Sequence, residues 1–507
     1  MRSPLHALLA ASGLLLALGA GSCGGAAEPG DGRDADRPPQ HVLLIVIDTL
    51  RADHLSCYGY PRVTSPNIDA LATRGVRFDQ HIAQSSWTAP SMVTMMTGQR
   101  LTGPRLDVPD QTPVLAELFK DAGYRTGAWS ANELLCADNG FDRGFDVFVD
   151  EKEWHSKKPV GRLDEIVAWL KENKDNDTFT WVHFTDPHDP YLPPAKTRTE
   201  EPVELSPEQR ELIASVAEVK EIAGVEPETA YIAHEIGRYD DEIVSVDIKV
   251  RKLLATLQEI GRFEEAVVVV TSDHGETLWQ RAESDMRVLL RQKAREKKQQ
   301  GDLRVRDLFK QTHGDFVYQE LVRVPLIIAA PGLEAGSVVS APLESIHLPR
   351  TILALAGVDV EGVEQMVGRD LFGGNVPTGA YSMTKLGEAF VSEDHWKLIL
   401  PTTRGMEDWE YETQLYDLGS DPHERDNLAA ERPEKVAELT RRIEERRAVA
   451  LPRLTKLEQR QRELENMARL EALGYLGDIV EPMDEDEAER LAAQKESEGE
   501  GTHDHDD

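Results

Sequence analysis

Residues 41–48, HVLLIVID, decide the fold class of this chain because an unbroken apolar strand ends there at an acidic residue. The hydrophobic residues from Val42 to Ile47 follow one another without polar alternation, and Asp48 stops the run. A strand with one solvated face alternates apolar and polar residues, whereas an unbroken run is typical of a parallel strand covered on both faces. We therefore expect an α/β sheet with this strand near its centre.

Three other segments repeat the pattern of a buried strand followed by a turn or polar residues. They are VVVV (267–270) before Thr-Ser-Asp-His-Gly, DTFTWVHF (177–184) before Thr-Asp-Pro-His-Asp, and RVPLIIAA (323–330) before Pro-Gly. Apolar residues at helical spacing lie between them, as in 241–261. Strands that alternate with helices predict a mostly parallel, doubly wound sheet. Functional groups of such sheets gather at the carboxyl ends of the strands.

Asp48, Asp273 and His274 are candidate metal ligands because each directly follows a predicted strand or its short polar turn. Two adjacent ionisable residues at the end of a buried strand are costly unless something satisfies them. The alternative for each aspartate alone is a turn former or a helix cap. The pair Asp273-His274 after four valines is the more specific signal, and it favours the metal site.

Six segments in order carry a family resemblance: 46–60 (VIDTLRADHLSCYGY), 65–98 (ending SSWTAPSMVTMMTG), 184–194 (FTDPHDPYLPP), 267–276 (VVVVTSDHGE), 312–332 (beginning THGDFVYQEL), and 396–399 (WKLI) with 415–429 (LYDLGSDPHERDNLA). Together they resemble the sulfatase family, within the alkaline phosphatase superfamily, over about residues 41–430. The resemblance implies an alkaline-phosphatase-like, mostly parallel sheet flanked by helices, with a smaller C-terminal α+β subdomain.

The resemblance also implies a set of metal ligands. Asp48 corresponds to the first aspartate of the family's Asp-Asp pair, and Thr49 takes the place of the second. Asp273 and His274 correspond to the later metal-binding pair. Thr88 lies where typical sulfatases carry the cysteine or serine that is oxidised to formylglycine, so we expect its hydroxyl at the metal, at the start of a helix that ends at Thr97-Gly98.

Catalytic roles follow from the same resemblance. Thr88 takes the position of the nucleophile, and Arg51 is retained from the family pattern. His188 and His313 correspond to family histidines that contact the substrate ester or protonate its leaving group. We therefore expect Thr88 to attack in line and one of the two histidines to protonate the departing oxygen.

The chain departs from the family at three cationic positions of the substrate pocket. Met92 replaces the arginine of the Cys-x-Pro-Ser-Arg signature, and Ala128 stands where a lysine usually precedes the tryptophan. The usual lysine after His313 is also missing. A standard sulfate pocket would thus lack three positive contacts.

Thr88 changes the expected chemistry. A formylglycine hydrate attacks with one hydroxyl and expels sulfate with the other, and a threonine has no second hydroxyl. Its adduct must be broken by an activated water or an acceptor alcohol, as in phosphoenzymes, so Thr88 favours phosphorus over sulfur. An imidazole at His274 and the lost carboxylate at Thr49 favour manganese or zinc over calcium. Asp186, His188 and His313 would be the ligands of a second metal.

Three functions remain open from the sequence. The first is a metal-dependent hydrolase of sulfate or phosphate esters, acting on a sulfated or phosphorylated sugar, lipid or aryl compound. The second is a phosphodiesterase or phosphotransferase for phospho-groups of the cell envelope, and the third is a non-catalytic relative that binds glycans. Retention of the metal and histidine set argues against the third, whereas the missing cations keep it open.

Charge limits the partners. The chain has 57 basic and 91 acidic residues, a net charge of −34, which argues against nucleic acid because such binding depends on basic patches. Residues 277–312 form a basic helical insert before His313. This insert is either a solvated helix or a lid that gathers an anionic substrate.

The N-terminus predicts export. Residues 1–22 read as a signal peptide, with an apolar run too short to span a bilayer and small residues before Cys23. This resembles a bacterial lipoprotein signal with Cys23 lipidated, although ordinary cleavage is the alternative. We expect a periplasmic or cell-envelope protein that contacts membrane only through that anchor. Residues 23–40 read as a flexible linker.

The remaining boundaries follow from composition. The catalytic domain should cover 41–375, and the small subdomain 376–430. Residues 431–478 read as a helical extension interrupted at Pro452, and 479–507 as an acidic, disordered tail. Cys57 and Cys136 are too few for a disulfide framework and are expected as buried thiols.

Overall fold

The computed structural model of the chain describes residues 40–150, 159–199, 202–207, 209–210, 229–278, 313–359, 366–402 and 412–451. Several predicted segments lie outside these ranges. They are the signal peptide with Cys23, the linker up to residue 39, the insert from 279 to 312, and everything after 451, which includes the acidic tail.

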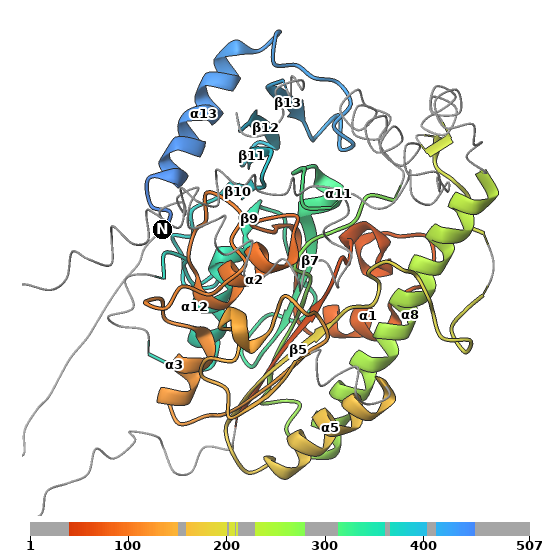
Figure 1. The fold of residues 1–507 in the computed structure, drawn as a ribbon, viewed down its shortest axis with the longest axis vertical. Helices are drawn as coiled ribbons and strands as arrows, with labels where there is room; N and C mark the ends of the chain where they lie inside the picture. Colours follow the sequence, from red (N-terminus) through yellow and green to blue (C-terminus); the bar gives the residue numbers. More distant parts are fainter. Residues whose placement is uncertain are drawn as a thin grey trace, which may run out of the picture. The chain divides into compact units, whose positions relative to one another are not determined.

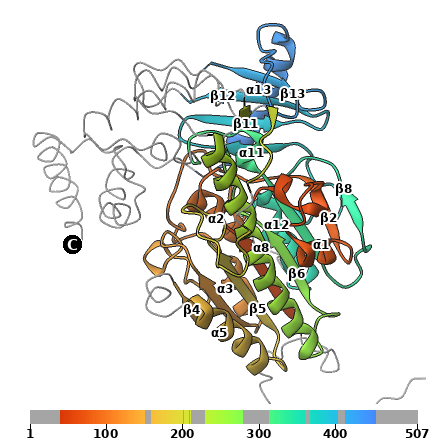
Figure 2. The same cartoon turned by 90° about the vertical axis from the view of Figure 1, so that its right-hand side faces the viewer.

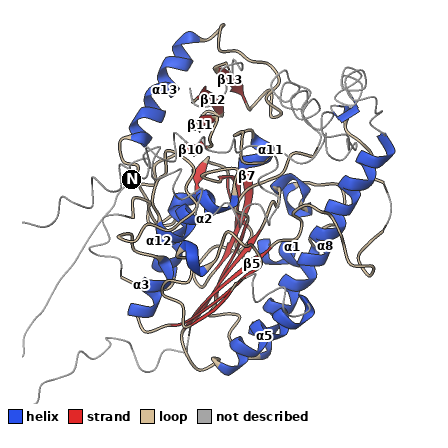
Figure 3. Cartoon of the chain, in the orientation of Figure 1, coloured by secondary structure: helices blue, strands red, loops and turns tan. Residues whose placement is uncertain are grey.

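A mixed, mostly parallel sheet forms the centre of the fold (Figure 3). Its strand order in the described residues is β4-β3-β5-β1-β6-β7-β2-β8, with β9 paired to β2. Strand β7 runs antiparallel to both β6 and β2. The strands are β1 His41–Ile47, β2 Val76–Ile82, β3 Arg125–Ser130, β4 Val147–Val149, β5 Thr178–Phe184, β6 Val267–Thr271, β7 Arg323–Ala329, β8 Ser337–Val339 and β9 Leu343–Glu344. The four strands expected from the sequence are thus confirmed.

Helices cover both faces of this sheet (Figures 1 and 2). Helices α2, α3 and α12 pack on one face, and α1, α5 and α8 pack on the other. Their bounds, with those of two shorter or peripheral helices, are α1 Pro66–Ala72, α2 Thr88–Thr97, α3 Leu115–Asp121, α5 Pro159–Glu172, α8 Thr229–Glu259, α11 Gln319–Val322, α12 Leu348–Leu355 and α13 Pro433–Arg447.

Strand β1 shows why its sequence has no polar alternation. Val42, Leu44 and Val46 point into the core beneath α2, α3 and α12. Their neighbours Leu43, Ile45 and Ile47 point into the core beneath α1, α5 and α8. All of them are fully buried, so a polar side chain at any of these positions would be taken out of water. The expected central strand, covered on both faces, is confirmed.

A second, antiparallel sheet follows in the chain, in the order β10-β11-β12-β13. Its strands are β10 Ala380–Met383, β11 Gly387–Val391, β12 Trp396–Pro401 and β13 Gln414–Asp417. Apolar side chains of this sheet and of α13 belong to the same core cluster as those of α2. The backbone N–H of Met383 donates to the carbonyl of Gln84 at 2.8 Å, which joins this sheet to the segment before α2. The predicted fold class is confirmed.

Two further observations concern the surroundings of the protein. Among the described residues, no helix combines the length and the apolar character needed to cross a membrane. Cys57 and Cys136 form no disulfide with each other. Cys136 is buried as expected, whereas Cys57 is only half-buried, so the expectation of a buried thiol is wrong there.

Leu44 tests how far the buried strand stabilises the fold. We expect Leu44→Ala to lower the free energy of unfolding by about 2–5 kcal/mol, because it removes buried methyl groups and leaves a cavity. Urea denaturation followed by tryptophan fluorescence measures this. Leu192→Ala is the matched control, since Leu192 is 69% exposed, and a change within about 0.5 kcal/mol is expected there. Equal losses in the two variants would contradict the assignment of β1 to the core.

Candidate metal centre and nucleophile

Sheet register brings the candidate ligands to one edge. Val46 of β1 pairs with His183 of β5 on one side and with Thr271 of β6 on the other. Asp48 and Asp273 each lie two residues further along their chains, so they continue the same face toward the carboxyl ends of the strands. This is the face on which α2 packs.

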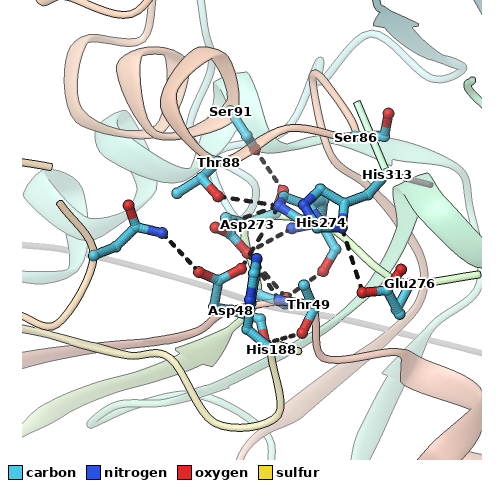
Figure 4. Close-up of polar contacts among 12 residues, drawn as sticks. Asp48, Thr49, Ser86, Thr88, Ser91, His188, Asp273, His274, Glu276 and His313 are labelled. Atoms are coloured by element: carbon cyan, nitrogen blue, oxygen red, sulfur yellow. Dashed lines mark hydrogen bonds and ion pairs between the residues drawn. The ribbon is translucent and has the colours of Figure 1, made fainter. Parts of the chain in front are cut away.

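Thr88 begins helix α2 and is fully buried. Its Oγ1 lies 3.2 Å from Nε2 of His274 (Figure 4). One turn later, Ser91 Oγ donates to the carbonyl of Asp273 at 2.6 Å, which fixes the start of the helix against the end of β6. The helix ends at Thr97 because Gly98 adopts a left-handed φ of 62°. The expected helix end is confirmed, and Thr88 lies beside His274.

His274 presents one specific nitrogen to this site. Its Nδ1 donates to the carbonyl of Gly275 at 2.8 Å, so the neutral ring carries its proton there. The lone pair of Nε2 then faces Thr88, Oδ1 of Asp48 at 3.6 Å and Oδ2 of Asp273 at 3.9 Å. A histidine held this way can ligate a metal or accept the proton of the Thr88 hydroxyl.

The two aspartates differ in how they are satisfied. Oδ1 of Asp273 accepts the backbone N–H of His274 at 2.8 Å and of Thr49 at 3.3 Å. Burial disfavours its charge, but the imidazoles of His274 and His183 outweigh that cost and lower the pKa of Asp273 below its usual range. Oδ2 of Asp48 accepts the Asn132 amide at 2.9 Å, whereas its Oδ1 is buried without a hydrogen-bond partner.

These donors fit a metal ion. One ligand atom each of Asp48, His183 and Asp273 lie within 4.8 Å of one another, and all three residues are fully buried. The contacts that link His274 to Thr88 and to the two carboxylates measure 3.2–3.9 Å. Neighbouring ligands of an ion with bonds of about 2.0–2.2 Å lie roughly 3.0–3.6 Å apart. The contacts to Thr88 and Asp48 fall in this range, whereas the 3.9 Å contact to Asp273 is longer. An ion here would also satisfy the unpaired oxygen of Asp48.

The sequence reasoning missed His183, Asn132 and Tyr239. His183 lies inside a run that reads as a buried strand, and Asn132 lies in the loop after β3. Tyr239 is one of many apolar or aromatic positions of helix α8. The signal that points to the first two is strand pairing, because β5 is bonded to both β1 and β3.

Thr49 occupies a strained turn rather than an open ligand position. Its φ is 56°, in the left-handed region that a β-branched residue rarely adopts. Its hydroxyl donates to the carbonyl of Asp48 at 2.7 Å, so this group is directed to the backbone. The hydroxyl of Tyr239 donates to the Thr49 carbonyl at 2.8 Å and accepts the backbone N–H of Arg51 at 3.0 Å. Tyr239 therefore holds the turn that follows Asp48.

Arg51 is buried in the loop after β1. Its guanidinium contacts both oxygens of Asp53, at 2.9 and 2.6 Å, and donates to the carbonyl of Glu276 at 3.1 Å. Burial disfavours the charge, but Asp53 outweighs it and raises the pKa of Arg51 above its usual value. These contacts attach the loop after β1 to the loop after β6, and the predicted catalytic role of Arg51 stays a prediction.

His188 and His313 meet beside His274. Their ring centroids are 5.1 Å apart, and His313 lies 4.7 Å from His274 (Figure 4). Burial disfavours a charged His188, but Asp48 and Glu276 outweigh it and raise the pKa of His188. Burial and the neighbouring imidazoles lower the pKa of His313 well below its usual value.

Glu276 completes this histidine group. Its Oε2 lies 3.3 Å from Nδ1 of His313, and burial raises the pKa of Glu276 to about 7. Asp186, expected in a second metal site, instead pairs with Nζ of Lys249. A second ion stays a prediction.

The positions that lack the usual cations are apolar in the structure. Met92 and Ala128 are fully buried in the core cluster on the α2 face. A charged side chain at either position would be surrounded by apolar atoms, which is costly.

Comparison with known proteins identifies the family. The family model described as Sulfatase matches residues 40–358, more than half of the chain. The chain belongs to the sulfatase family. Among relatives of this sulfatase-family protein, the ulvan-active sulfatase of Formosa agariphila is 25% identical over 373 residues, which cover 66% of this chain and 65% of that protein. The choline-sulfatase of Rhizobium meliloti is 24% identical over 460 residues, covering 77% and 82%.

Solved structures share the sulfatase fold, which lies within the alkaline phosphatase superfamily. A structure in complex with its substrate D-glucosamine-2-N,6-O-disulfate has a TM-score of 0.62 at 20% identity, covering 82% of this chain and 98% of that one. The phosphonate monoester hydrolase of Agrobacterium radiobacter has a TM-score of 0.61 at 19% identity, covering 82% and 96%. At these identities the likeness concerns the fold alone.

Tyr239 tests whether the strained turn matters for the metal centre. We expect Tyr239→Phe to weaken metal binding by about 10-fold or more, because the carbonyl of Thr49 and the N–H of Arg51 lose their shared partner. Isothermal titration of Mn²⁺ or Zn²⁺ into the metal-free protein measures this. Tyr318→Phe is the control, since this buried hydroxyl bonds to Gln414 instead. If both variants bind metal like the wild type, Tyr239 does not position the site.

Proposed function

We propose that this protein is a metal-dependent hydrolase of sulfate or phosphate esters that attacks through Thr88. The observation that carries the proposal is the 3.2 Å approach of the Thr88 hydroxyl to Nε2 of His274, beside two buried carboxylates. A helix N-terminus also favours the negative charge that an attacking oxygen and an ester group bring. Family membership supports ester hydrolysis as the reaction class.

Asp48, Asp273, His274 and Thr88 would hold the ion. Thr49, expected from the sequence as a further ligand, directs its hydroxyl to the Asp48 carbonyl instead. When bound, the ion would supply Lewis-acid charge that lowers the pKa of a hydroxyl and stabilises an ester oxygen. The imidazole donor favours manganese or zinc over calcium, which prefers an all-oxygen shell. The orientation of His274 by the Gly275 carbonyl supports this ligand role.

Each chain residue then has one task. The Thr88 hydroxyl gives its proton to solvent, its Oγ forms a bond to the sulfur or phosphorus, and the bond to the departing ester oxygen breaks on the opposite side. His188 is the better proton donor of the two histidines, because its pKa is raised whereas that of His313 is lowered. Water then cleaves the Thr88 adduct and returns the hydroxyl.

The local charge favours an ester with a single negative charge. Asp48 and Asp273 together cancel a divalent ion, and Met92 and Ala128 supply no cation. In the described part of the site, His188 is an imidazole whose pKa is raised, so it can carry a proton that offsets a remaining negative charge. Sulfate monoesters and phosphate diesters carry one such charge, whereas phosphate monoesters carry up to two. We therefore infer a preference for the first two.

A phosphodiesterase or phosphotransferase is the second candidate. Thr88 supports it, because a threonine adduct lacks the second hydroxyl by which formylglycine expels sulfate. His274 also supports this candidate, because its imidazole favours manganese or zinc over calcium. A non-catalytic, glycan-binding role is the weakest candidate, since the buried carboxylates and the aligned histidine serve no purpose in glycan binding.

The cellular setting is proposed from the N-terminal sequence. We infer export to the periplasm or cell envelope, with Cys23 as a lipid anchor and no other membrane contact. The substrate would be a sulfated or phosphorylated sugar, lipid or aryl compound that reaches this compartment.

Thr88 provides the direct test. We expect Thr88→Ala to lower turnover by about 10³-fold or more, and Thr88→Ser to retain part of it because the hydroxyl remains. Turnover of an aryl sulfate, a phosphodiester, a phosphonate monoester and a phosphate monoester is measured with Mn²⁺, Zn²⁺ and Ca²⁺. Undiminished turnover in Thr88→Ala at saturating metal would refute the nucleophile. Preference for a phosphodiester would select the second candidate, and calcium-dependent aryl sulfate cleavage would contradict the metal assignment.

His188 is tested through the leaving group. We expect His188→Gln to lower turnover of alkyl esters by about 10²–10⁴-fold, because their departing oxygen needs a proton. Nitrophenyl esters should lose far less, since nitrophenolate leaves unprotonated. The ratio of the two substrates within one variant is its own control for misfolding. A uniform loss on both would show that His188 does not act as the acid.

A further inference from the structure

We propose that His183 is a protein ligand of the metal ion, through Nε2, and supplies the donor that Thr49 lost. The inference rests on the proposed metal site and extends it to a residue from strand β5. It makes the centre a two-imidazole, two-carboxylate site joined by Thr88.

The position of His183 in the sheet is the first argument for its role as a ligand. His183 is fully buried, and its strand partner Val46 lies two residues before Asp48. Its Nε2 lies 3.4 Å from Oδ2 of Asp273, at the long limit of a hydrogen bond. The same spacing suits two ligands of one ion, since bonds of about 2.0–2.2 Å place ligand atoms roughly 3.0–3.6 Å apart.

The second argument is an oxygen of Asp48 that has no hydrogen-bond partner. Asp48 Oδ1 is buried and accepts no hydrogen bond, although a buried carboxylate normally uses both oxygens. One ligand atom each of Asp48, Asp273 and His183 lie within 4.8 Å of one another. His183 thus belongs to the same group of ligand atoms as Asp48, a carboxylate with one unsatisfied oxygen.

Thr49 explains why an extra donor is needed. A second aspartate at this position would bring a carboxylate, but the Thr49 hydroxyl donates to the Asp48 carbonyl instead. The left-handed turn is held in that form by Tyr239. An imidazole from the neighbouring strand restores the number of protein ligands without restoring the negative charge.

The substitution changes which ion the site suits. Two neutral imidazoles with two carboxylates give a net charge of −2 before metal binding, which one divalent ion balances. Nitrogen donors suit zinc, manganese or iron, whereas calcium and magnesium prefer oxygen shells. Ion binding at Nε2 leaves the imidazole proton on Nδ1, so His183 must be neutral to bind.

The experiment counts imidazoles around the bound ion. Full-length protein is loaded with one equivalent of Zn²⁺ or Co²⁺, and X-ray absorption gives the number of histidine ligands. We expect two in the wild type, and one each in His183→Asn and His274→Asn. One imidazole in the wild type would overturn the proposal, and this measurement needs no variant to fold.

The affinity for Zn²⁺ distinguishes a direct metal ligand from a residue that only hydrogen-bonds to a ligand. We expect His183→Asn to weaken Zn²⁺ binding by more than about 100-fold, the upper range for loss of an outer-shell partner. His81→Asn is the matched control, because His81 is a fully buried histidine of the same sheet that contacts Ser345. A smaller loss with an unchanged imidazole count would make His183 only a hydrogen-bond partner of Asp273 and overturn the proposal.

The outcomes distinguish this inference from the proposed function. If the wild type binds no divalent ion, or if Asp48→Asn and His274→Asn bind it normally, the metal site itself is wrong. If those two variants lose the ion while His183→Asn keeps both the affinity and the imidazole count, only the role of His183 fails.

Discussion

Two fully buried carboxylates impose the constraint on which the rest of the structure depends. Asp48 and Asp273 have ligand atoms within 4.8 Å of each other, at the ends of adjacent strands. Moving such a charge out of water costs on the order of several kcal/mol unless partners compensate. Backbone N–H groups, an Asn132 amide and imidazoles provide part of that compensation. Oδ1 of Asp48 still lacks a hydrogen-bond partner, and a bound cation would compensate its charge.

The sequence alone predicted those features that are set by residues adjacent in the chain. The apolar run of β1 and the Asp-His pair after β6 are local patterns, and both strands lie where those patterns indicated. His183 could not be found this way, since the ligand role proposed for it depends on β5 lying beside β1. The register pairs His41 with Thr178, 137 positions later in the chain. The left-handed turn at Thr49 was equally hidden, because a threonine gives no signal for positive φ.

The family resemblance predicted roles for the site residues, whereas the structure shows which side chains they contact. Thr88 and His274 lie together as their motif positions implied, whereas Arg51 is paired with Asp53. The apolar burial of Met92 and Ala128 shows that the missing cations are not a local vacancy. Both positions are buried in the apolar core. Side chains that bind the ester group must therefore come from other positions of the site.

The bond between Met383 and Gln84 has a consequence for how the protein is made. The segment that leads into the nucleophile helix is synthesised early, yet one of its backbone partners arrives about 300 residues later. Domains tend to fold from the N-terminus as the chain emerges, but contacts between distant segments must wait for both. While the chain is still being synthesised, the segment before α2 therefore lacks this backbone partner until strand β10 has emerged.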